Sequence, residues 1–357
     1  MRYLQNIPAV RGDSEANFQI MKEVGILLKN TVKHVDPVIK KLLSRGVEEN
    51  TKMLLFYQVE AGGKRLRPCL AMISCLACGG KARDMLYCAA GLEILHTYTL
   101  IVDDLIDHSA KRRGKLTTWR KFGKSLAECI GVDYGASLLE AAARSINPRV
   151  VATIYGRAIK EVVDGEILDI LFEQGGREDE MYVQRYRVKS VVWRDYLHMI
   201  GKKTASLFSS ACGLGGIGAN ASRREIAALK KYGWNLGIAF QIADDILDLY
   251  GKQQFGKPLG QDIRERKLGN ILVLFALGEL SLKERKTVKE IFRKDSIKES
   301  DVKRVIAYIK KTGAKERALS FAQSYVRKAK VSLNPLHAGR YRNALGEFAE
   351  FALKREK

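Results

Sequence analysis

The sequence predicts an all-α fold, a single helical bundle with a deep apolar pocket at its centre. The chain has 357 residues, 46% of them hydrophobic, and can therefore bury a large core. It contains six prolines, none of them between Pro148 and Pro258, which leaves room for long unbroken helices. No pair of alternating apolar segments is joined by an Asn-Gly or Asp-Gly turn, the usual sign of a hairpin.

Helical periodicity is clearest between Arg224 and Tyr250, where Gly251 follows as a natural stop. Apolar or small residues recur there at intervals of three and four: Ile226, Leu229, Gly233, Leu236, Phe240, Ala243 and Leu247. A second helix is expected from about Met85 to His108, and the basic C-terminal third is expected to form helices with polar outer faces. No linker or repeat interrupts the pattern, so residues 1–357 are expected to form one domain.

The N-terminal segment does not resemble a signal peptide, and no apolar run reaches the ~18 residues needed to cross a bilayer. We therefore expect a cytoplasmic protein whose six cysteines are reduced. Cys75 and Cys78 form a CxxC pair, but no second pair supports zinc binding. We interpret both as core residues.

The chain is strongly basic, with 62 Lys and Arg against 40 Asp and Glu and a formal net charge of +22. Residues 283–357 contain 21 basic and nine acidic side chains, which is more than half of the excess. Such a surface can meet anionic lipid, nucleic acid or only solvent. No nucleic-acid-binding signature accompanies it, so we expect no nucleic-acid partner. Peripheral contact with an anionic membrane and a solvated surface remain as alternatives.

Two DDxxD motifs occur on apolar helical segments, 141 positions apart. Their members are Asp103, Asp104 and Asp107 in the first and Asp244, Asp245 and Asp248 in the second. Residues three and four apart share a helix face, so each motif is expected to gather its carboxylates on one side. These like charges repel, and Mg²⁺, which prefers hard oxygen ligands, relieves the repulsion. One such motif alone is more often an exposed acidic face, whereas a facing pair predicts a two-walled metal site for a diphosphate.

Two short basic runs supply candidate cations for such a ligand. The first is the turn from Gly62 to Pro68, with Lys64 and Arg67, and the second contains Arg112 and Arg113. Arg binds two phosphate oxygens with its forked guanidinium, while Lys acts as a point charge. Each run alone is readily explained as solvated charge. Beside a carboxylate lobe, however, they suggest a pocket that holds two diphosphates together.

His96 lies seven residues before Asp103, two turns away on nearly the same helix face. A satisfied core histidine and a phosphate ligand are both consistent with that position. Further polar residues near apolar helical runs are Lys203, Thr204, Gln241, Lys257 and Lys267. Individually they indicate little.

Taken in order, these blocks resemble the trans-isoprenyl diphosphate synthase family. The matching segments are Gly62–Pro68, Leu92–Gly114, Gly165–Glu173, Lys202–Leu207, Gly237–Gly251 and Gly256–Lys267. The resemblance implies a helical bundle of the isoprenoid-synthase type and a homodimer. The segments His96–Leu100 and Gly256–Pro258 look like those of archaeal short-chain members.

In that family the two aspartate motifs hold three magnesium ions around the allylic diphosphate. The resemblance implies that Asp103, Asp107 and Asp244 are the ligands, supported by Asp104, Asp245 and Asp248, partly through water. It implies that isopentenyl diphosphate is held by Lys64, Arg67, His96 and Arg113. It also implies which residues hold the allylic diphosphate or stabilise its departure: Arg112, Lys203, Thr204, Gln241, Lys257 and Lys267.

The implied reaction is ionisation, condensation and elimination. Metals and cations stabilise the leaving diphosphate, the isopentenyl double bond attacks the allylic cation, and a proton is lost to the departing diphosphate. The sequence departs from the family pattern at Val102 and Trp119, where many members have His, and at Glu166, where Gln is usual. Gly269 and Asn270 follow Lys267 without the usual threonine, which puts turnover in doubt more than reaction type.

Product length depends on how deep the apolar pocket extends. Tyr98 lies five residues before Asp103, about 7.5 Å along the helix axis, and Thr99 lies one turn below Asp103. In the family, an aromatic residue at this position is typical of archaeal geranylgeranyl diphosphate synthases. Ideal helix geometry places Tyr98 off the Asp103 face, so an ordinary core role remains open.

Three alternatives remain open. A synthase of farnesyl or longer products is the nearest. A class I terpene cyclase would share the metal aspartates but would not need Lys64, Arg67 and Arg113. A non-catalytic partner subunit would be expected to lose one aspartate motif, and both are intact here.

Overall fold

Helices make up most of the structure, a computed structural model that describes residues 13–251 and 259–354 and side chains from residue 24 onward. Seventeen of the described elements are α-helices: α1 (Asp13–Leu43), α2 (Glu49–Glu60), α3 (Leu66–Ala77), α4 (Leu86–Ile106), α5 (Thr118–Phe122), α6 (Lys124–Ala143), α7 (Pro148–Leu171), α8 (Met181–Tyr186), α9 (Trp193–Ile200), α10 (Ser206–Gly218), α11 (Arg223–Tyr250), α12 (Gln261–Arg264), α13 (Ile271–Glu279), α14 (Leu282–Phe292), α15 (Glu299–Lys310), α16 (Ala314–Ser332) and α17 (Arg340–Lys354). A 3₁₀ turn, η1 (Ala82–Met85), precedes α4, and a π-helical turn, η2 (Gly201–Ala205), precedes α10. The predicted all-α fold is therefore confirmed.

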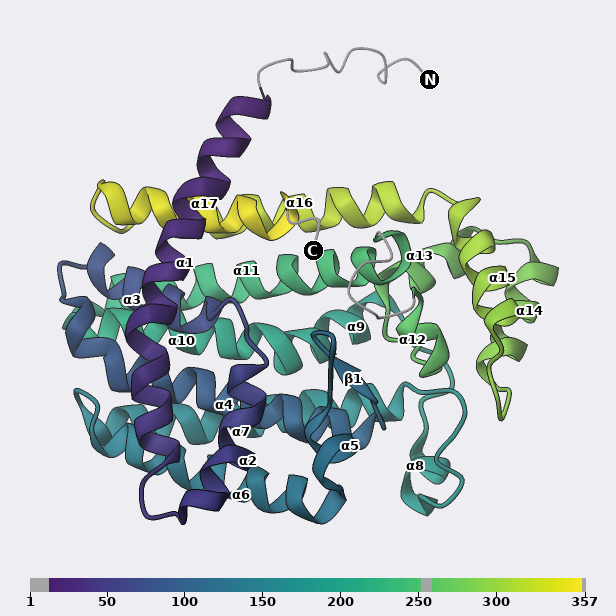
Figure 1. The fold of residues 1–357 in the computed structure, drawn as a ribbon. Coiled ribbons are helices and arrows are strands. Elements are labelled where there is room, and N and C mark those ends of the chain that lie inside the picture. The colour runs from purple at the N-terminus through teal and green to yellow at the C-terminus, as the bar shows by residue number, and fades with distance from the viewer. Residues whose placement is uncertain (1–12, 252–258, 355–357) are drawn as a thin grey trace, which may run out of the picture.

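The long helices lie side by side in layers, and α1 crosses the front of the bundle (Figure 1). In the middle, α10 packs against α11 and α3, α11 packs against α16, and α4 packs against α6. The turn η2 contacts both α7 and α11, so these elements meet near the centre. Helices α14 and α15 form one end of the molecule, beyond α12 and α13 (Figure 1).

Helix α11 confirms the strongest periodic pattern and begins one residue earlier than predicted. Ser222 and Glu225 form a capping box at its start, where the serine hydroxyl accepts from the Glu225 backbone N–H. Its small residues allow close packing, because a Cβ on Gly233 would lie 2.4 Å from the Phe208 carbonyl oxygen on α10. This close approach fixes the position of the second aspartate motif at the far end of α11.

Helix α4 confirms the second predicted helix with ends within two residues of expectation. The segment Ala82–Ile106 is long and apolar enough to cross a bilayer by length and composition alone, although no such segment was expected. Within its most apolar window, however, 61% is buried inside the fold, as in a core helix.

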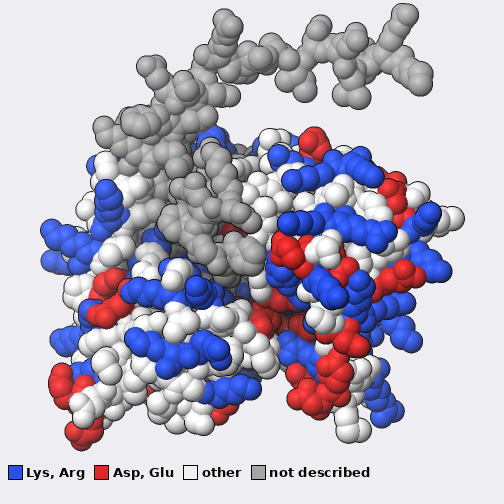
Figure 2. Space-filling model, turned by 45° about the vertical axis from the view of Figure 1, so that its right-hand side comes forward, with Lys and Arg blue, Asp and Glu red and all other residues white. Residues whose placement is uncertain are grey.

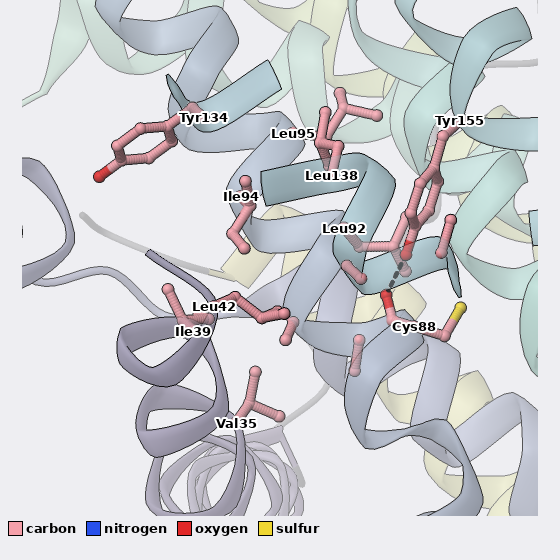
Figure 3. Packing of buried hydrophobic residues seen from close by; sticks show 14 of the residues in the cluster. Val35, Ile39, Leu42, Cys88, Leu92, Ile94, Leu95, Tyr134, Leu138 and Tyr155 are labelled. Atoms are coloured by element: carbon pink, nitrogen blue, oxygen red, sulfur yellow. Dashed lines mark hydrogen bonds between the residues drawn. The ribbon is translucent and has the colours of Figure 1, made fainter. Parts of the chain in front are cut away.

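One of the three buried cores surrounds α4 and is shown in Figure 3. There Leu92 and Leu95 of α4 pack with Leu138 of α6 and Tyr155 of α7 (Figure 3). The Tyr155 hydroxyl donates to the Cys88 carbonyl oxygen at 2.6 Å, which satisfies this buried polar group. This core holds α4 rigidly below the first aspartate motif.

A short β-hairpin with two residues in each strand interrupts the series of helices, and it was not predicted. Strand β1 (Lys111–Arg112) pairs antiparallel with β2 (Lys115–Leu116). Its turn residues, Arg113 and Gly114, both have positive φ values, 53° and 78°. Such turns usually carry Asn-Gly or Asp-Gly, so an Arg-Gly turn between charged residues gave no recognisable signal.

Candidate active site

A cavity of about 990 Å³ lies between α4, α7, η2, α11 and the loops before and after α12. It brings together most of the residues that the sequence singled out. Those that line it are Lys64, Arg67, His96, Thr99, Asp103, Asp107, Arg112, Arg113, Lys203, Thr204, Gln241, Asp244, Asp245, Asp248 and Lys267.

Two described site residues that the sequence predicted do not line this cavity, and a third, Lys257, lies outside the described residues. Asp104 is buried behind it with 1% of its surface exposed. Tyr98 is half-buried and directs its ring toward α6, where a Cβ on Gly131 would lie 3.2 Å from the ring.

The first aspartate motif occupies the C-terminal end of α4. Asp103 and Asp107, four residues apart, both face the cavity. Asp104 points away from it and accepts a hydrogen bond at 2.9 Å from Nε of Arg112. The expectation that all three carboxylates share one side is therefore wrong for Asp104, because adjacent helical positions differ by about 100° in direction. Asp104 instead anchors Arg112, whose Nη2 lies 2.8 Å from Asp103.

Lys203 reaches the same carboxylates from η2. Its Nζ lies 2.7 Å from Glu166, 2.8 Å from Asp169 and 3.3 Å from Asp103. A π-helical turn at this point is typical of functional sites, where it redirects a side chain. The turn also packs tightly on α7, because a Cβ on Gly165 would lie 2.3 Å from the Lys203 backbone nitrogen.

Lys267 closes the opposite side of this cluster. Its Nζ lies 3.1 Å from Asp107, 3.0 Å from Glu265 and 3.3 Å from Asp169. Asp169 thus bridges two lysines, although sequence reasoning did not select it. The signal was present, because Asp169 follows Glu166 by three residues on one face of α7, within a segment that matched the family.

The second aspartate motif lies at the C-terminal end of α11, and its three carboxylates have different partners. Asp245 is buried and accepts from the Ile271 backbone N–H at 3.0 Å and from Gln241 Nε2 at 3.1 Å. Asp248 accepts from the Gln261 backbone N–H at 2.9 Å, at the start of α12. Asp245 and Asp248 therefore hold the neighbouring loops, whereas Asp244 lies half-buried in the cavity wall.

Thr204 extends this network, since its hydroxyl donates to Gln241 Oε1 at 2.8 Å. Asn270, which stands where the family pattern differs, is fully buried and precedes the first residue of α13. Its side-chain oxygen accepts from the Leu272 backbone N–H at 2.9 Å, and its amide donates to Asp262 at 2.8 Å. The substitution thus supplies a helix N-cap.

A basic lobe, consisting of Lys64, Arg67, His96 and Arg113, lines the other part of the cavity. Arg65 was missed as a contributor. It is 2% exposed and adopts a left-handed conformation with φ of 50°. Its guanidinium binds Asp36 on α1 at 2.8 Å and Glu93 on α4 at 3.1 Å, and it donates to the Gly62 carbonyl at 3.3 Å. Arg65 therefore ties the turn that carries Lys64 and Arg67 to two helices.

The two carboxylates of the first aspartate motif that face the cavity carry opposite pKa shifts. Burial would raise the pKa of Asp103, but the nearby charges of Lys203 and Arg112 outweigh it and hold that pKa well below its usual range. Burial raises the pKa of Asp107 well above its usual value, and Asp103 adds to the effect against the opposing charge of Lys267. Burial, aided by Asp262, raises the pKa of Asp248 to about 8.

The pKa of His96 is shifted in the direction that keeps the imidazole neutral. Burial lowers its pKa well below the usual value, and the positive charges of Arg67 and Arg113 lower it further. A neutral imidazole beside two guanidinium groups offers one N–H donor without adding charge. The basic lobe therefore depends on its arginines and Lys64 for charge.

The donor set fits a divalent cation. Within residues 24–251 and 259–354, no three His, Cys, Asp or Glu side chains converge closely enough to hold a metal by themselves. Magnesium does not require this, because it usually takes one or two carboxylates together with phosphate oxygens of the ligand. Asp103, Asp107 and Asp244 supply hard oxygen atoms from two walls of the cavity. The site is thus suited to an ion that arrives with a diphosphate.

Known proteins are similar to this chain in sequence and in fold. Residues 48–309 match the family model described as polyprenyl synthetase. The chain is 34% identical over 341 residues to a short chain isoprenyl diphosphate synthase of Methanothermobacter thermautotrophicus, covering 94% of this chain and 100% of the relative. It is 33% identical over 338 residues to a geranylgeranyl diphosphate synthase of Sulfolobus acidocaldarius, covering 91% and 97%. The solved structure of a polyprenyl synthase from Caulobacter crescentus, complexed with calcium and isoprenyl diphosphate, matches with a TM-score of 0.84 at 29% identity, over 94% of this chain and 98% of that one.

Proposed function

This chain belongs to the polyprenyl synthetase family and is a prenyltransferase, and from that premise we propose that it makes geranylgeranyl diphosphate. Family members are trans-prenyl diphosphate synthases that act on isopentenyl and allylic diphosphates. The proposed reaction extends an allylic diphosphate by successive isopentenyl units to an all-trans twenty-carbon product. The observation that carries the proposal is one cavity with an aspartate wall on each side and a separate basic lobe.

Each diphosphate has its own part of this cavity in the proposal. The allylic diphosphate is held beside the aspartates by Arg112, Lys203 and Lys267, with Thr204 and Gln241 as further polar contacts. Isopentenyl diphosphate is held by the basic lobe. This division follows from the distances, because Lys203 and Lys267 already contact Asp103 and Asp107, while Arg113 lies beside the Gly63 turn.

Magnesium is the proposed cofactor, as three ions in the family pattern, with Asp103, Asp107 and Asp244 as ligands. The family is metal-dependent, and a structural relative was solved with calcium and isoprenyl diphosphate. The ions neutralise the diphosphate and stabilise the charge that develops as it leaves. Asp104, Asp245 and Asp248 position the surrounding elements, through Arg112, Ile271 and Gln261 respectively.

The side chains of this chain would bind and orient rather than react covalently. Lys203, Lys267 and Arg112 face the leaving diphosphate and stabilise its negative charge. The apolar residues Leu100, Val162 and Leu207 line the cavity beside the allylic carbon chain and limit access of water. The proton lost after condensation passes to the departing diphosphate, and no nucleophilic side chain is required.

Product length rests on the depth of the pocket below Asp103. Thr99 lines the cavity one turn below that residue and is too small to block it. In the proposal, the Tyr98 ring limits growth on the α6 side. The alternatives are a farnesyl or longer-chain synthase and, less favoured, a class I terpene cyclase or a non-catalytic partner subunit.

A homodimer is the proposed assembly. Adjacent helices α6 and α7 expose several large apolar side chains, among them Val132 at 73%, Leu139 at 71% and Val163 at 49%. Unpartnered apolar side chains on packed neighbouring helices suit contact with a second copy. A single domain and a cytoplasmic location belong to the same proposal.

The test is incubation with labelled isopentenyl diphosphate and each allylic primer, followed by chromatographic sizing of the products. A twenty-carbon product supports the proposal, and a fifteen-carbon or longer product favours the first alternative. A cyclic hydrocarbon formed without isopentenyl diphosphate would indicate a cyclase. No incorporation by a folded protein would indicate a non-catalytic subunit.

A further inference from the structure

One end of the molecule carries a dense positive surface, here called the basic face and defined as the exposed Lys and Arg side chains of residues 282–317. These residues form α14, α15 and the start of α16. Eleven Lys and Arg side chains are exposed there, against four exposed Asp and Glu. Figure 2 shows Lys and Arg side chains crowding the side of the molecule where α14 and α15 lie. The active-site chemistry uses none of them.

Few of these charges are neutralised within the described residues. Lys303, Lys310 and Arg317 make no ion pair with any described side chain, and the pair between Lys311 and Glu284 is long, at 3.8 Å. Several basic groups instead rest on aromatic rings. Arg304 and Lys311 lie over Tyr308 at 5.8 and 5.4 Å from the ring centroid, and Arg317 lies over Phe275 at 4.1 Å. Cation–π contacts hold these charges in place without neutralising them.

The basic face adjoins the active site. Lys310 of the basic face and the neighbouring, half-buried Lys315 lie 5.7 and 4.7 Å from the ring of Tyr250, the last residue of α11. Tyr250 follows Asp248, which lines the cavity, by two positions. Arg264 of α12 also pairs with Glu299 of α15 at 2.5 Å. An anionic partner on this face would therefore lie near the end of α11 that carries the second aspartate motif.

We propose that the basic face docks the enzyme on a membrane surface rich in anionic phosphate headgroups. The inference rests on the proposed function, because a long prenyl diphosphate is an amphiphile whose hydrocarbon chain partitions into a bilayer. Each Lys or Arg near an anionic leaflet adds to the attraction, and several act together. Leu282, 82% exposed beside Lys283, favours a lipid interface over nucleic acid because it offers an apolar contact among the charges.

The test measures binding to vesicles without substrates, so it does not depend on catalysis. Wild type is sedimented with vesicles of phosphatidylcholine alone and of phosphatidylcholine with phosphatidylglycerol. A charge variant replaces Lys303, Arg304, Lys310 and Lys311 on α15 with Gln. A matched control replaces four exposed lysines at other sites: Lys29, Lys33, Lys41 and Lys81. Thermal unfolding verifies that both variants fold.

We expect wild type and the control to bind only the anionic vesicles, and the α15 variant to bind them at least ~10-fold more weakly. Condensation with soluble substrates should be unchanged in the α15 variant. Four results would overturn the inference: no binding of wild type to anionic vesicles, equal loss in both variants, equally tight binding of duplex DNA, or a lower kcat/KM of the α15 variant without vesicles. The last result would show that the charges attract soluble diphosphates instead.

Discussion

Lys267 and Asp107 are 160 residues apart in the chain, and the lysine Nζ lies 3.1 Å from both carboxylate oxygens of the aspartate. The same relationship recurs between Lys203 and Asp103 at 3.3 Å. Two lysines thus rest on the two carboxylates that we propose as metal ligands. When a metal and a diphosphate bind, the diphosphate offers each lysine a new negative partner. The lysines therefore have an anionic partner both in the free site and in the bound site.

Removing a proposed ligand from either wall should abolish most turnover. Asp103→Ala and Asp244→Ala are each expected to lower kcat at least ~100-fold, because charge stabilisation at the leaving group is lost. Asp84→Ala, at an exposed position on η1, serves as the control and should retain activity. Steady-state assays with magnesium are the measurement. Near-normal turnover in either folded cavity variant would refute the ligand assignment.

Replacing Lys267 should separate metal binding from turnover. In Lys267→Met, Asp107 loses its cationic partner, so Mn²⁺ alone should bind more tightly than to wild type, as measured by calorimetry without substrate. Turnover should fall at least ~10-fold, since the lysine no longer stabilises the leaving diphosphate. Lys283→Met on exposed α14 is the matched control. Unchanged metal affinity would mean that Lys267 does not compete for Asp107.

The two diphosphate subsites should respond to different substitutions. Arg113→Ala is expected to raise KM mainly for isopentenyl diphosphate, because its guanidinium lies beside the Gly63 turn in the basic lobe. Lys203→Ala is expected to affect mainly the allylic substrate, since its Nζ lies among Asp103, Glu166 and Asp169. Kinetics with each substrate varied in turn decide between them. Equal effects on both substrates would show that the cavity is not divided in this way.

The metal-free protein should lose stability as pH rises toward 8. Burial and Asp262 raise the pKa of Asp248 to about 8, from 3.8 for an unperturbed aspartate. Between these values the folded state binds a proton that the unfolded state lacks, so the free energy of unfolding falls as pH increases. In Asp248→Asn, the fall in the free energy of unfolding between pH 6 and 8 should be smaller than in wild type by on the order of 1 kcal/mol. Identical pH profiles of chemical denaturation for wild type and variant would contradict the shift.

Product length should depend on the aromatic ring at position 98. Tyr98→Ala is expected to give longer prenyl diphosphates, because the lost ring opens space between α4 and Gly131 of α6. Tyr98→Phe keeps the ring and should leave the product unchanged. Truncating a packed aromatic residue costs ~3–5 kcal/mol, so folding must be verified first. An unchanged product from folded Tyr98→Ala would assign the ring to the core instead.

The sequence predicted the two long helices α4 and α11, which have long apolar faces and clear ends, but gave no bounds for the other helices. It did not predict the β1–β2 hairpin, whose Arg-Gly turn lacks the usual residues. Nor did it reveal that Asp104 is buried outside the cavity lining and holds Arg112, eight residues later in the chain.

The site residues that belong to recognisable sequence motifs could be predicted. The buried charged residues that hold them in place could not. The aspartates and the cations of the basic runs stand out in the sequence, and the fold brings them to one cavity. Asp169 and Glu93 lie in segments that matched the family, but neither belongs to a motif that names a partner for it. Only the tertiary structure shows that Asp169 joins Lys203 to Lys267, and that Glu93 anchors Arg65.

The most direct test of prenyl transfer is incorporation of labelled isopentenyl diphosphate into an organic-soluble product as magnesium is titrated, with farnesyl diphosphate as primer. We predict that incorporation requires both magnesium and primer, stops with EDTA, and yields one product of geranylgeranyl length after phosphatase treatment. A folded protein that incorporates no label with farnesyl diphosphate or any shorter allylic primer, at any magnesium concentration, would contradict the assignment.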